Sequence, residues 1–148
     1  MYIRELQPLE LRSLLVLYTH LHERDDPMPP DAEVETVWAE ALANPRIKYI
    51  GGFSGDSLVS SCTLTVIPNL TRACRPYGVI ENVVTHEAYR SQGWGKAVLA
   101  HALDEAWHQR CYKVMLLTGR KDEATLRFYE QAGFDRCSKQ AFLAKPTV

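Results

Sequence analysis

The chain has 148 residues, of which 46% are hydrophobic and 24% charged, and its formal net charge is −1. This size supports one domain with a real core, the composition excludes a disordered chain, and the charge excludes bulk attraction to nucleic acid. No apolar run reaches transmembrane length and the first five residues carry no targeting signal, so we expect a single domain, residues 1–148, in the cytoplasm and with no membrane partner.

The first half of the chain shows the patterns of short strands and amphipathic helices. Leucines and Tyr18 make a broad apolar face on the first helix, and prolines and charges then break it. Asp31 is placed to cap the next helix. We expect a strand at 2–6, a helix at 8–22, a loop at 23–30, a helix from 31 to 44, a hairpin of strands 47–53 and 57–67, and a polar connection at 69–77.

Two glycines, Gly93 and Gly95, lie between a β-branched run at 79–85 and a helix at 96–110 that carries an apolar stripe. A helix start leaves its first backbone N–H groups without internal partners, and its dipole favours negative charge there. Glycine has no Cβ, so an anion can approach these groups closely. The motif predicts a phosphate-binding loop.

Two common kinds of phosphate loop do not fit this motif. A P-loop needs Ser or Thr after its lysine, with four residues between its glycines, and here Ala97 follows Lys96. A dinucleotide fingerprint needs a small residue where Val98 stands and an acid at the end of the next strand. The motif therefore belongs to another class of loop.

A second motif follows at residues 113–134. A strand at 113–117 precedes a short helix for which Asp122 is the expected N-cap and Gly133 the residue after the C-terminus. This helix carries the phrase Phe128-Tyr129-Glu130. With a final strand pair expected at 134–145, the element order predicts a mixed sheet with helices on both faces.

The glycine motif and the Phe-Tyr-Glu phrase, in this order, resemble the Gcn5-related N-acetyltransferase (GNAT) family. From Gly78 to Phe134 the chain is also similar to glucosamine-6-phosphate N-acetyltransferases, although Asn82 stands where those enzymes usually have Asp. The resemblance implies an α/β acyl-CoA N-acyltransferase fold, with a central mixed, mostly antiparallel sheet. It also implies direct transfer of an acetyl group from acetyl-CoA to a primary amine, without a metal.

The resemblance also implies which residues bind acetyl-CoA. The strand before the glycine loop would pair with the pantetheine arm, and the loop amides would bind the pyrophosphate. Arg90 and Lys96 would add positive charge, although long basic side chains beside a turn are often only solvated. The implied cofactor-binding residues are Val83, Val84, Thr85, Arg90, Ser91, Gln92, Gly93, Trp94, Gly95, Lys96, Ala97, Asp122, Phe128 and Tyr129.

Two side chains are candidates for proton transfer. The resemblance places Tyr129 beside the coenzyme sulfur, where a phenol can protonate the leaving thiolate, whereas spacing alone would make it a packed helix residue. Glu81 interrupts an apolar strand, and it is either a base or water relay facing a polar cleft or a solvated surface residue. Asn82 would join Glu81 in binding the acceptor only if the strand bulges there.

The acceptor amine is open at this stage. Arg72, Arg75, Arg24 and Arg120 are possible clamps for an amino-sugar phosphate, whereas Asp25 and Asp26 would instead favour a polyamine-like or protein amine. A non-catalytic acyl-CoA-binding regulatory module is the alternative from a different functional class. The resemblance also suggests a homodimer, and the spacing of the four cysteines and five histidines suggests no metal site.

Overall fold

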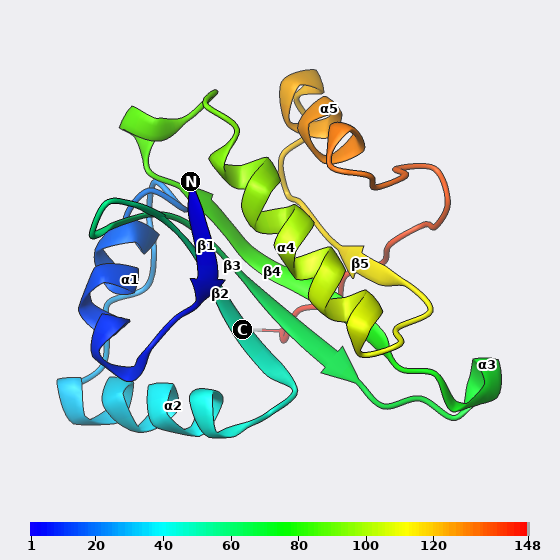
Figure 1. Cartoon of the computed structure of the whole chain (residues 1–148), viewed down its shortest axis with the longest axis horizontal. Helices are drawn as coiled ribbons and strands as arrows, with labels where there is room; N and C mark the ends of the chain where they lie inside the picture. The colour runs from blue at the N-terminus through cyan, green and yellow to red at the C-terminus, as the bar shows by residue number, and fades with distance from the viewer. Residues whose placement is uncertain (148) are drawn as a thin grey trace. The chain divides into compact units, whose positions relative to one another are not determined.

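The computed structural model describes residues 1–147, and the chain folds as two compact units, Met1–Leu116 and a second unit that begins at Leu117. The described part of the first unit contains one sheet in the order β1-β2-β3-β4-β5 (Figure 1). The first four strands are antiparallel neighbours and β5 runs parallel to β4. The strands are β1 (Tyr2–Glu5), β2 (Ile47–Ser54), β3 (Ser57–Ile67), β4 (Tyr77–Thr85) and β5 (Val114–Leu116).

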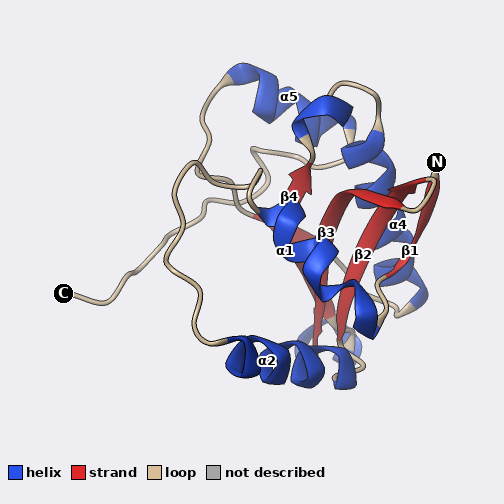
Figure 2. Ribbon diagram, turned by 90° about the vertical axis from the view of Figure 1, so that its left-hand side faces the viewer, coloured by secondary structure: helices blue, strands red, loops and turns tan. Residues whose placement is uncertain are grey.

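Helices cover both faces of this sheet, which confirms the expected fold class (Figure 2). A Cβ on Gly51 would meet Leu6 and Leu58 on one face, and a Cβ on Gly52 would meet Trp94 and Val98 on the other. The first face carries α1 and α2, and the second carries α4. The helices of the unit are η1 (Pro8–Glu10), α1 (Leu11–Tyr18), α2 (Asp31–Ala43), α3 (Thr71–Cys74), η2 (Glu87–Tyr89) and α4 (Trp94–His108).

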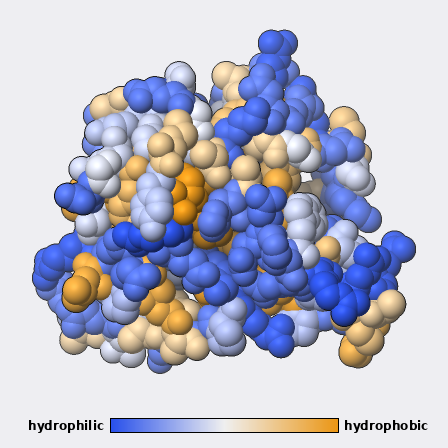
Figure 3. Space-filling view, in the orientation of Figure 1, coloured by the Kyte–Doolittle hydropathy of each residue, from blue (hydrophilic) through white to orange (hydrophobic). Residues whose placement is uncertain are grey.

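Each face has a buried apolar layer. Under α1, Leu14 and Leu17 pack with Phe53, Leu58 and Val84. On the α4 side, the helix buries one stripe at helical spacing, Trp94, Val98, Leu99, Ala102 and Ala106. The outer surface in the view of Figure 1 is mostly hydrophilic, with small hydrophobic patches (Figure 3). Among the helices of residues 1–147, none is both long and apolar enough to cross a bilayer.

Three details of the first unit differ from the sequence expectation. The first helix ends at Tyr18 and begins with a 3-10 turn, so its α-helical part is shorter than 8–22. Pro30, not Asp31, is the N-cap of α2, and no side chain caps this end. The short α3 in the polar connection is a left-handed turn, because Arg72, Ala73 and Cys74 all have φ between 56° and 59°.

The described part of the second unit contains one helix, α5 (Glu123–Gln131). Both expected caps are confirmed: the Asp122 carboxylate accepts from the Thr125 N–H at 2.9 Å, and Gly133 has φ 99°. The expected strand pair at 134–145 is wrong, because the chain is irregular there. A strand needs a hydrogen-bonded neighbour, and residues 134–147 pair with no strand of the described chain.

We expect Leu17→Ala to lower the free energy of unfolding by about 2–5 kcal/mol, because Leu17 is 1% exposed in the layer under α1 and its truncation leaves a cavity. Urea unfolding followed by circular dichroism measures this change. Val16→Ala is the matched control, since Val16 is on the same helix and 65% exposed. Equal losses in the two variants would contradict the packing described here.

Candidate functional site

The pairing of β4 with β3 is interrupted by a bulge. Glu81 pairs with Thr63 and Val84 with Ser61, so Asn82 and Val83 oppose the single residue Cys62. Asn82 has φ 54°, in the left-handed region that asparagine tolerates better than most residues. Glu81 and Asn82 could serve one pocket only with such a bulge, and the strand has it.

The opposite edge of β4 is open beyond the bulge. β5 pairs only with Gly78–Ile80, so from Glu81 to Thr85 no strand of the described chain pairs with β4 on that side. Edge groups of a strand can pair with another extended chain. The open edge contains Val83, Val84 and Thr85, the residues expected to pair with the pantetheine arm. On the other side, the Ser60 hydroxyl donates to the Val84 carbonyl at 3.0 Å and lies 2.9 Å from the Thr85 hydroxyl.

The glycine loop leads from this strand into α4. Gly93 is the N-cap with φ 87°, and Ser91 is also left-handed with φ 60°. The Ala97 N–H donates to the Gly93 carbonyl, whereas no described residue accepts from the N–H groups of Trp94, Gly95 and Lys96. These free groups at the positive end of a 15-residue helix are suited to an anion.

Arg90 fixes the loop to the rest of the unit. Its guanidinium donates to the carbonyls of Thr85 and His20, each at 3.2 Å, and so ties the end of β4 to the turn after α1. The rings of His20 and His86 lie 4.1 Å apart beside it. No local pattern predicts the long-range contact with His20, and this contact gives Arg90 a structural role besides any charge that it presents to a ligand.

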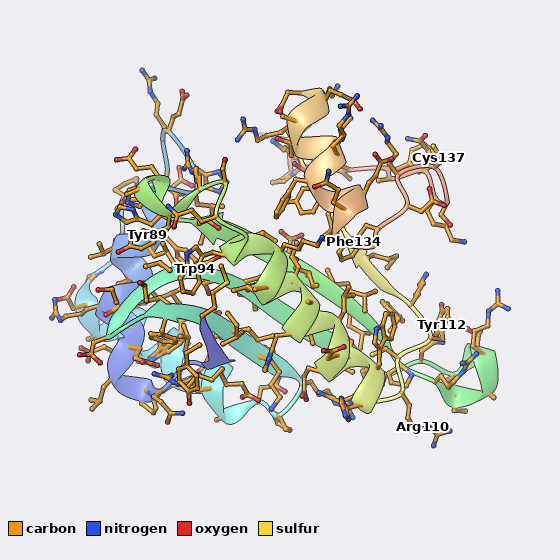
Figure 4. The ribbon with its side chains drawn as sticks, turned by 45° about the horizontal axis from the view of Figure 1, so that its top comes forward. Tyr89, Trp94, Arg110, Tyr112, Phe134 and Cys137 are labelled. Carbon is orange, nitrogen blue, oxygen red and sulfur yellow. The ribbon has the colours of Figure 1, made fainter. Side chains whose placement is uncertain are left out.

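Other loop side chains also bond locally. Gln92 Nε2 donates to the Ala88 carbonyl at 2.9 Å, and Lys96 is exposed. The Tyr89 and Trp94 rings lie 6.3 Å apart at the start of α4, whereas Arg110 and Tyr112 lie beyond its other end (Figure 4). The loop is therefore held by its own contacts before any ligand arrives.

A polar group lies on the α1 side of the bulge. The Glu81 carboxylate is exposed and makes no hydrogen bond or ion pair with any described residue. The hydroxyls of Tyr18, Ser61 and Thr63 are buried, and none makes a hydrogen bond of good geometry with residues 1–147, although the Tyr18 hydroxyl lies near the Thr63 and Asn82 side chains. Burial raises the pKa of Tyr18 to about 12, partly offset by the nearby Thr63 and Asn82 side chains, so its phenol stays neutral. Sequence reasoning missed Tyr18 because its spacing fits an apolar face.

A basic and aromatic cluster lies at the start of β4. Arg72 and Arg75 each lie 5.9 Å from the Tyr112 ring, and Lys113 lies 5.3 Å from Tyr112 and 5.4 Å from Tyr77. None of the three cations pairs with a carboxylate of the described chain. We call these five residues the basic cluster.

The basic cluster shares a face of β4 with Glu81. No bulge separates Tyr77 from Glu81, so strand alternation places Tyr77, Val79 and Glu81 on one face. Tyr77 and Val79 are only half-buried and Glu81 is exposed, whereas Gly78 and Ile80 on the opposite face are buried. Tyr77, Val79 and Glu81 therefore form a partly open strip on β4, which we call the β4 strip. The three cations of the basic cluster lie at its Tyr77 end, and the Glu81 carboxylate lies at its other end.

In the second unit, Tyr129 is half-buried and packs with two other aromatic side chains. Its ring lies 4.9 Å from Phe128 and 6.4 Å from Phe134. Asp122 is occupied as the cap of α5 and accepts from Arg120 Nε at 3.1 Å. Hydrogen bonds from Thr125 hold the pKa of Asp122 below its usual range, and the bond from the Thr125 N–H contributes most. No three His, Cys, Asp or Glu residues within 1–147 are arranged to hold a metal ion.

Comparisons with known proteins agree with this geometry. The model of the acetyltransferase (GNAT) family matches residues 11–134. The glucosamine 6-phosphate N-acetyltransferase of Trypanosoma brucei brucei is 33% identical over 141 residues, which cover 93% of this chain and 91% of that protein. This relative confirms the local similarity that the sequence analysis stated.

Solved structures give the same fold. A putative acetyltransferase from Agrobacterium tumefaciens strain C58 superposes with a TM-score of 0.92 at 42% identity, covering 99% of this chain and all of the other. Glucosamine-6-phosphate N-acetyltransferase from Arabidopsis thaliana superposes with a TM-score of 0.80 at 23% identity, covering 97% of its own length and 98% of this chain, which shows the fold alone. Since the family model spans most of the chain and ends with the Phe-Tyr-Glu helix, the protein is an N-acetyltransferase of the acetyltransferase (GNAT) family.

Proposed function

We propose that this protein transfers the acetyl group of acetyl-CoA directly to the primary amine of a phosphorylated amino sugar. The observation that carries the coenzyme part is the continuity of the open β4 edge with the free amides at the start of α4. An extended thiol arm that pairs with Val83–Thr85 would lead its pyrophosphate into the loop from Arg90 to Ala97. The GNAT family uses acetyl-CoA, and the residues present fit this co-substrate.

The open edge also suits the reacting carbonyl. A thioester paired along β4 would direct its oxygen at backbone N–H groups near the bulge, which can stabilise the oxyanion of a tetrahedral intermediate. Pre-positioning of the two reactants on one strand would reduce the entropic part of the barrier. These donors are backbone groups, so they need no particular side chain at Val83 or Val84.

We assign proton transfer to Glu81 and Tyr129. The amine nitrogen attacks the thioester carbon while its proton passes to Glu81, directly or through water, and the carbon–sulfur bond then breaks. The phenol of Tyr129 gives its proton to the departing thiolate, since ordinary phenols and thiols have comparable pKa values of about 10 and 8.5. Asn82, turned by the bulge, would bind the acceptor beside Glu81, and Asp122 and Phe128 would border the coenzyme.

The strip on β4 supports an acceptor with an anionic end. The Cα atoms of Tyr77 and Glu81 are about 13 Å apart, at about 3.3 Å per strand residue. Long basic side chains reach over part of this distance, and one sugar with its phosphate can cover the rest. Arg72, Arg75 and Lys113 pair with no carboxylate of residues 1–147, and the trypanosome relative is named for glucosamine 6-phosphate.

We also propose that the chain works as a cytoplasmic homodimer without a metal. Phe142 and Leu143, neighbours in the irregular C-terminal segment, are 91% and 76% exposed, and a second copy of the chain could cover them. Light scattering measures the assembly. A polyamine-like or protein amine remains the competing acceptor, and an acyl-CoA-binding module without transfer is the competing function.

We expect Gly93→Val to weaken acetyl-CoA binding by at least about tenfold, or 1.4 kcal/mol. A β-branched residue does not tolerate φ 87°, and its side chain would crowd the free amides. Isothermal titration measures the affinity. Gly55→Val is the matched control, because Gly55 has φ 58° in the β2–β3 turn and nothing within 4 Å of its Cβ position. If the affinity for acetyl-CoA is unchanged, the pyrophosphate binds at another site.

We expect Tyr129→Phe to lower kcat by about 100-fold, the low end of general acid catalysis, while the affinity for acetyl-CoA stays the same. Release of free thiol with glucosamine 6-phosphate as acceptor measures kcat across pH. Tyr2→Phe, at a 62% exposed tyrosine, is the control. If the Tyr129 variant matches the parent at every pH, another group protonates the thiolate.

We expect the double variant Arg75→Ala/Lys113→Ala to raise KM for glucosamine 6-phosphate about tenfold or more, because two charge-assisted contacts to phosphate are lost. KM for unphosphorylated glucosamine should change little, and Arg12→Ala, which removes an exposed cation from α1, should leave both values unchanged. A turnover assay with both sugars and with a polyamine measures the comparison. Equal loss with both sugars, or turnover with the polyamine alone, would reject the phosphate assignment.

A further inference from the structure

A buried serine lies behind the open edge of β4. Ser60 on β3 is 0% exposed and pairs with Thr85, the last residue of β4. Its partner on β2 is Gly52, and a Cβ at this glycine would meet Trp94 and Val98 of α4. Residues directly opposite each other in a sheet share one face, so Ser60 and Thr85 lie on the face that α4 covers.

The Ser60 hydroxyl has two hydrogen-bond partners, and both belong to β4. It donates to the Val84 carbonyl at 3.0 Å. A hydroxyl carries one proton, so the Thr85 hydroxyl, 2.9 Å away, donates to Ser60 in turn. The result is a chain of hydrogen bonds from the Thr85 side chain through Ser60 to the backbone of β4. Bonds in such a buried chain strengthen one another.

The pairing at the end of β4 shows which backbone groups face the open edge. The His86 N–H donates to the Val59 carbonyl, so these two residues form a hydrogen-bonded pair. Such pairs alternate with non-hydrogen-bonded pairs along an antiparallel ladder, so Thr85, opposite Ser60, points its N–H and its carbonyl away from β3. The carbonyl accepts from Arg90 Nε at 3.2 Å, which leaves the Thr85 N–H as the donor on the open edge.

The Ser60 bond orients the peptide unit that carries this donor. The Val84 carbonyl and the Thr85 N–H belong to one planar trans peptide, so they point in opposite directions. A carbonyl that Ser60 holds on the β3 side therefore keeps the N–H on the open side. The bulge at Asn82 and Val83 comes directly before this unit and interrupts the regular ladder. The Ser60 hydroxyl thus adds a restraint where the ladder supplies least.

We propose that Ser60 is a positioning residue for acetyl-CoA. Through the Val84 carbonyl it directs the Thr85 N–H at the open edge, where this N–H donates to the pantetheine arm. The inference rests on the proposed pairing of the arm with β4, and it adds a residue that lies outside both sequence motifs. Because Ser60 is 0% exposed, it acts through β4 and does not touch the coenzyme itself.

Isothermal titration of the full chain with acetyl-CoA tests the proposal. We expect Ser60→Ala to lower the affinity by about fivefold, the size of effect that one hydrogen bond has. Thr85→Val should lower it less, because the bond from Ser60 to Val84 remains. Ser61→Ala is the matched control and should bind like the parent, since Ser61 is also 0% exposed on β3 but its hydroxyl makes no hydrogen bond with residues 1–147.

Two further measurements separate positioning from a general loss of structure. The nucleotide fragment of coenzyme A that ends at the pyrophosphate lacks the pantetheine arm, so Ser60→Ala should bind this fragment as tightly as the parent does. Amide hydrogen exchange followed by NMR gives the local measurement. In the parent, acetyl-CoA should slow the exchange of the Thr85 N–H by more than about tenfold, and Ser60→Ala should lose most of this protection.

Equal affinity of the parent and Ser60→Ala for acetyl-CoA would overturn the proposal. So would an equal loss for acetyl-CoA and for the nucleotide fragment, because Ser60 would then only support the fold. Protection of the Thr85 N–H distinguishes this failure from that of the proposed function. If the parent protects Thr85 and Ser60→Ala does so equally, only the role of Ser60 is wrong. If acetyl-CoA leaves Thr85 unprotected in the parent, the pairing with β4 is wrong, and the role of Ser60 with it.

Discussion

β4 pairs with two strands of very different length, β3 and β5, and this difference constrains the rest of the site. β3 accompanies it from Tyr77 to Thr85, but β5 pairs with only three of its residues. Without a correction, the residues past Ile80 would continue the regular alternation and turn Asn82 toward α4. The bulge adds one residue at this point, with Asn82 in the left-handed region, and so changes which side chains face α1. The exposed edge follows from the short β5, whereas the orientation of Asn82 and the path of the strand toward the glycine loop depend on this local irregularity.

The strand also separates the two places that we propose for binding phosphate groups. After its C-terminal end, backbone N–H groups and the dipole of α4 suit an anion while using almost no formal charge. At its N-terminal end, Arg72, Arg75 and Lys113 provide charge through flexible side chains around two tyrosine rings. The net charge of −1 does not conflict with two proposed anion sites, because both would rest on local groups and not on the overall charge.

The sequence best predicted the features that depend on neighbouring residues. The hairpin around Gly55, the apolar stripe of α4 and the Asp122 and Gly133 caps of α5 all follow from neighbouring residues, and the structure has them. Two of the failures involve contacts between distant residues. The strand pair at 134–145 depends on partners that local propensity cannot identify, and the bond from Arg90 to the His20 carbonyl joins residues that are 70 apart in the sequence.

The candidate site shows the same division. The phosphate loop and Glu81 are visible in the sequence, whereas Tyr18 looks like one more member of an apolar helix face. A cavity between α1 and α2 was also invisible in the sequence, because it depends on how the two helices rest on the sheet. The Asp25–Asp26 pair was noticed as a feature that favours cations, but only the structure shows that it borders an apolar space.

The three buried hydroxyls of Tyr18, Ser61 and Thr63 have a consequence for how much stability this fold sacrifices. A buried polar group without a partner costs about 1–3 kcal/mol, a large fraction of the 5–15 kcal/mol that typically separates folded from unfolded chains. Phenylalanine, alanine and valine would pack in these positions without that cost. Substitutions that remove one of these hydroxyls are therefore expected to raise the free energy of unfolding, and the positions where such a gain is expected lie beside the bulge.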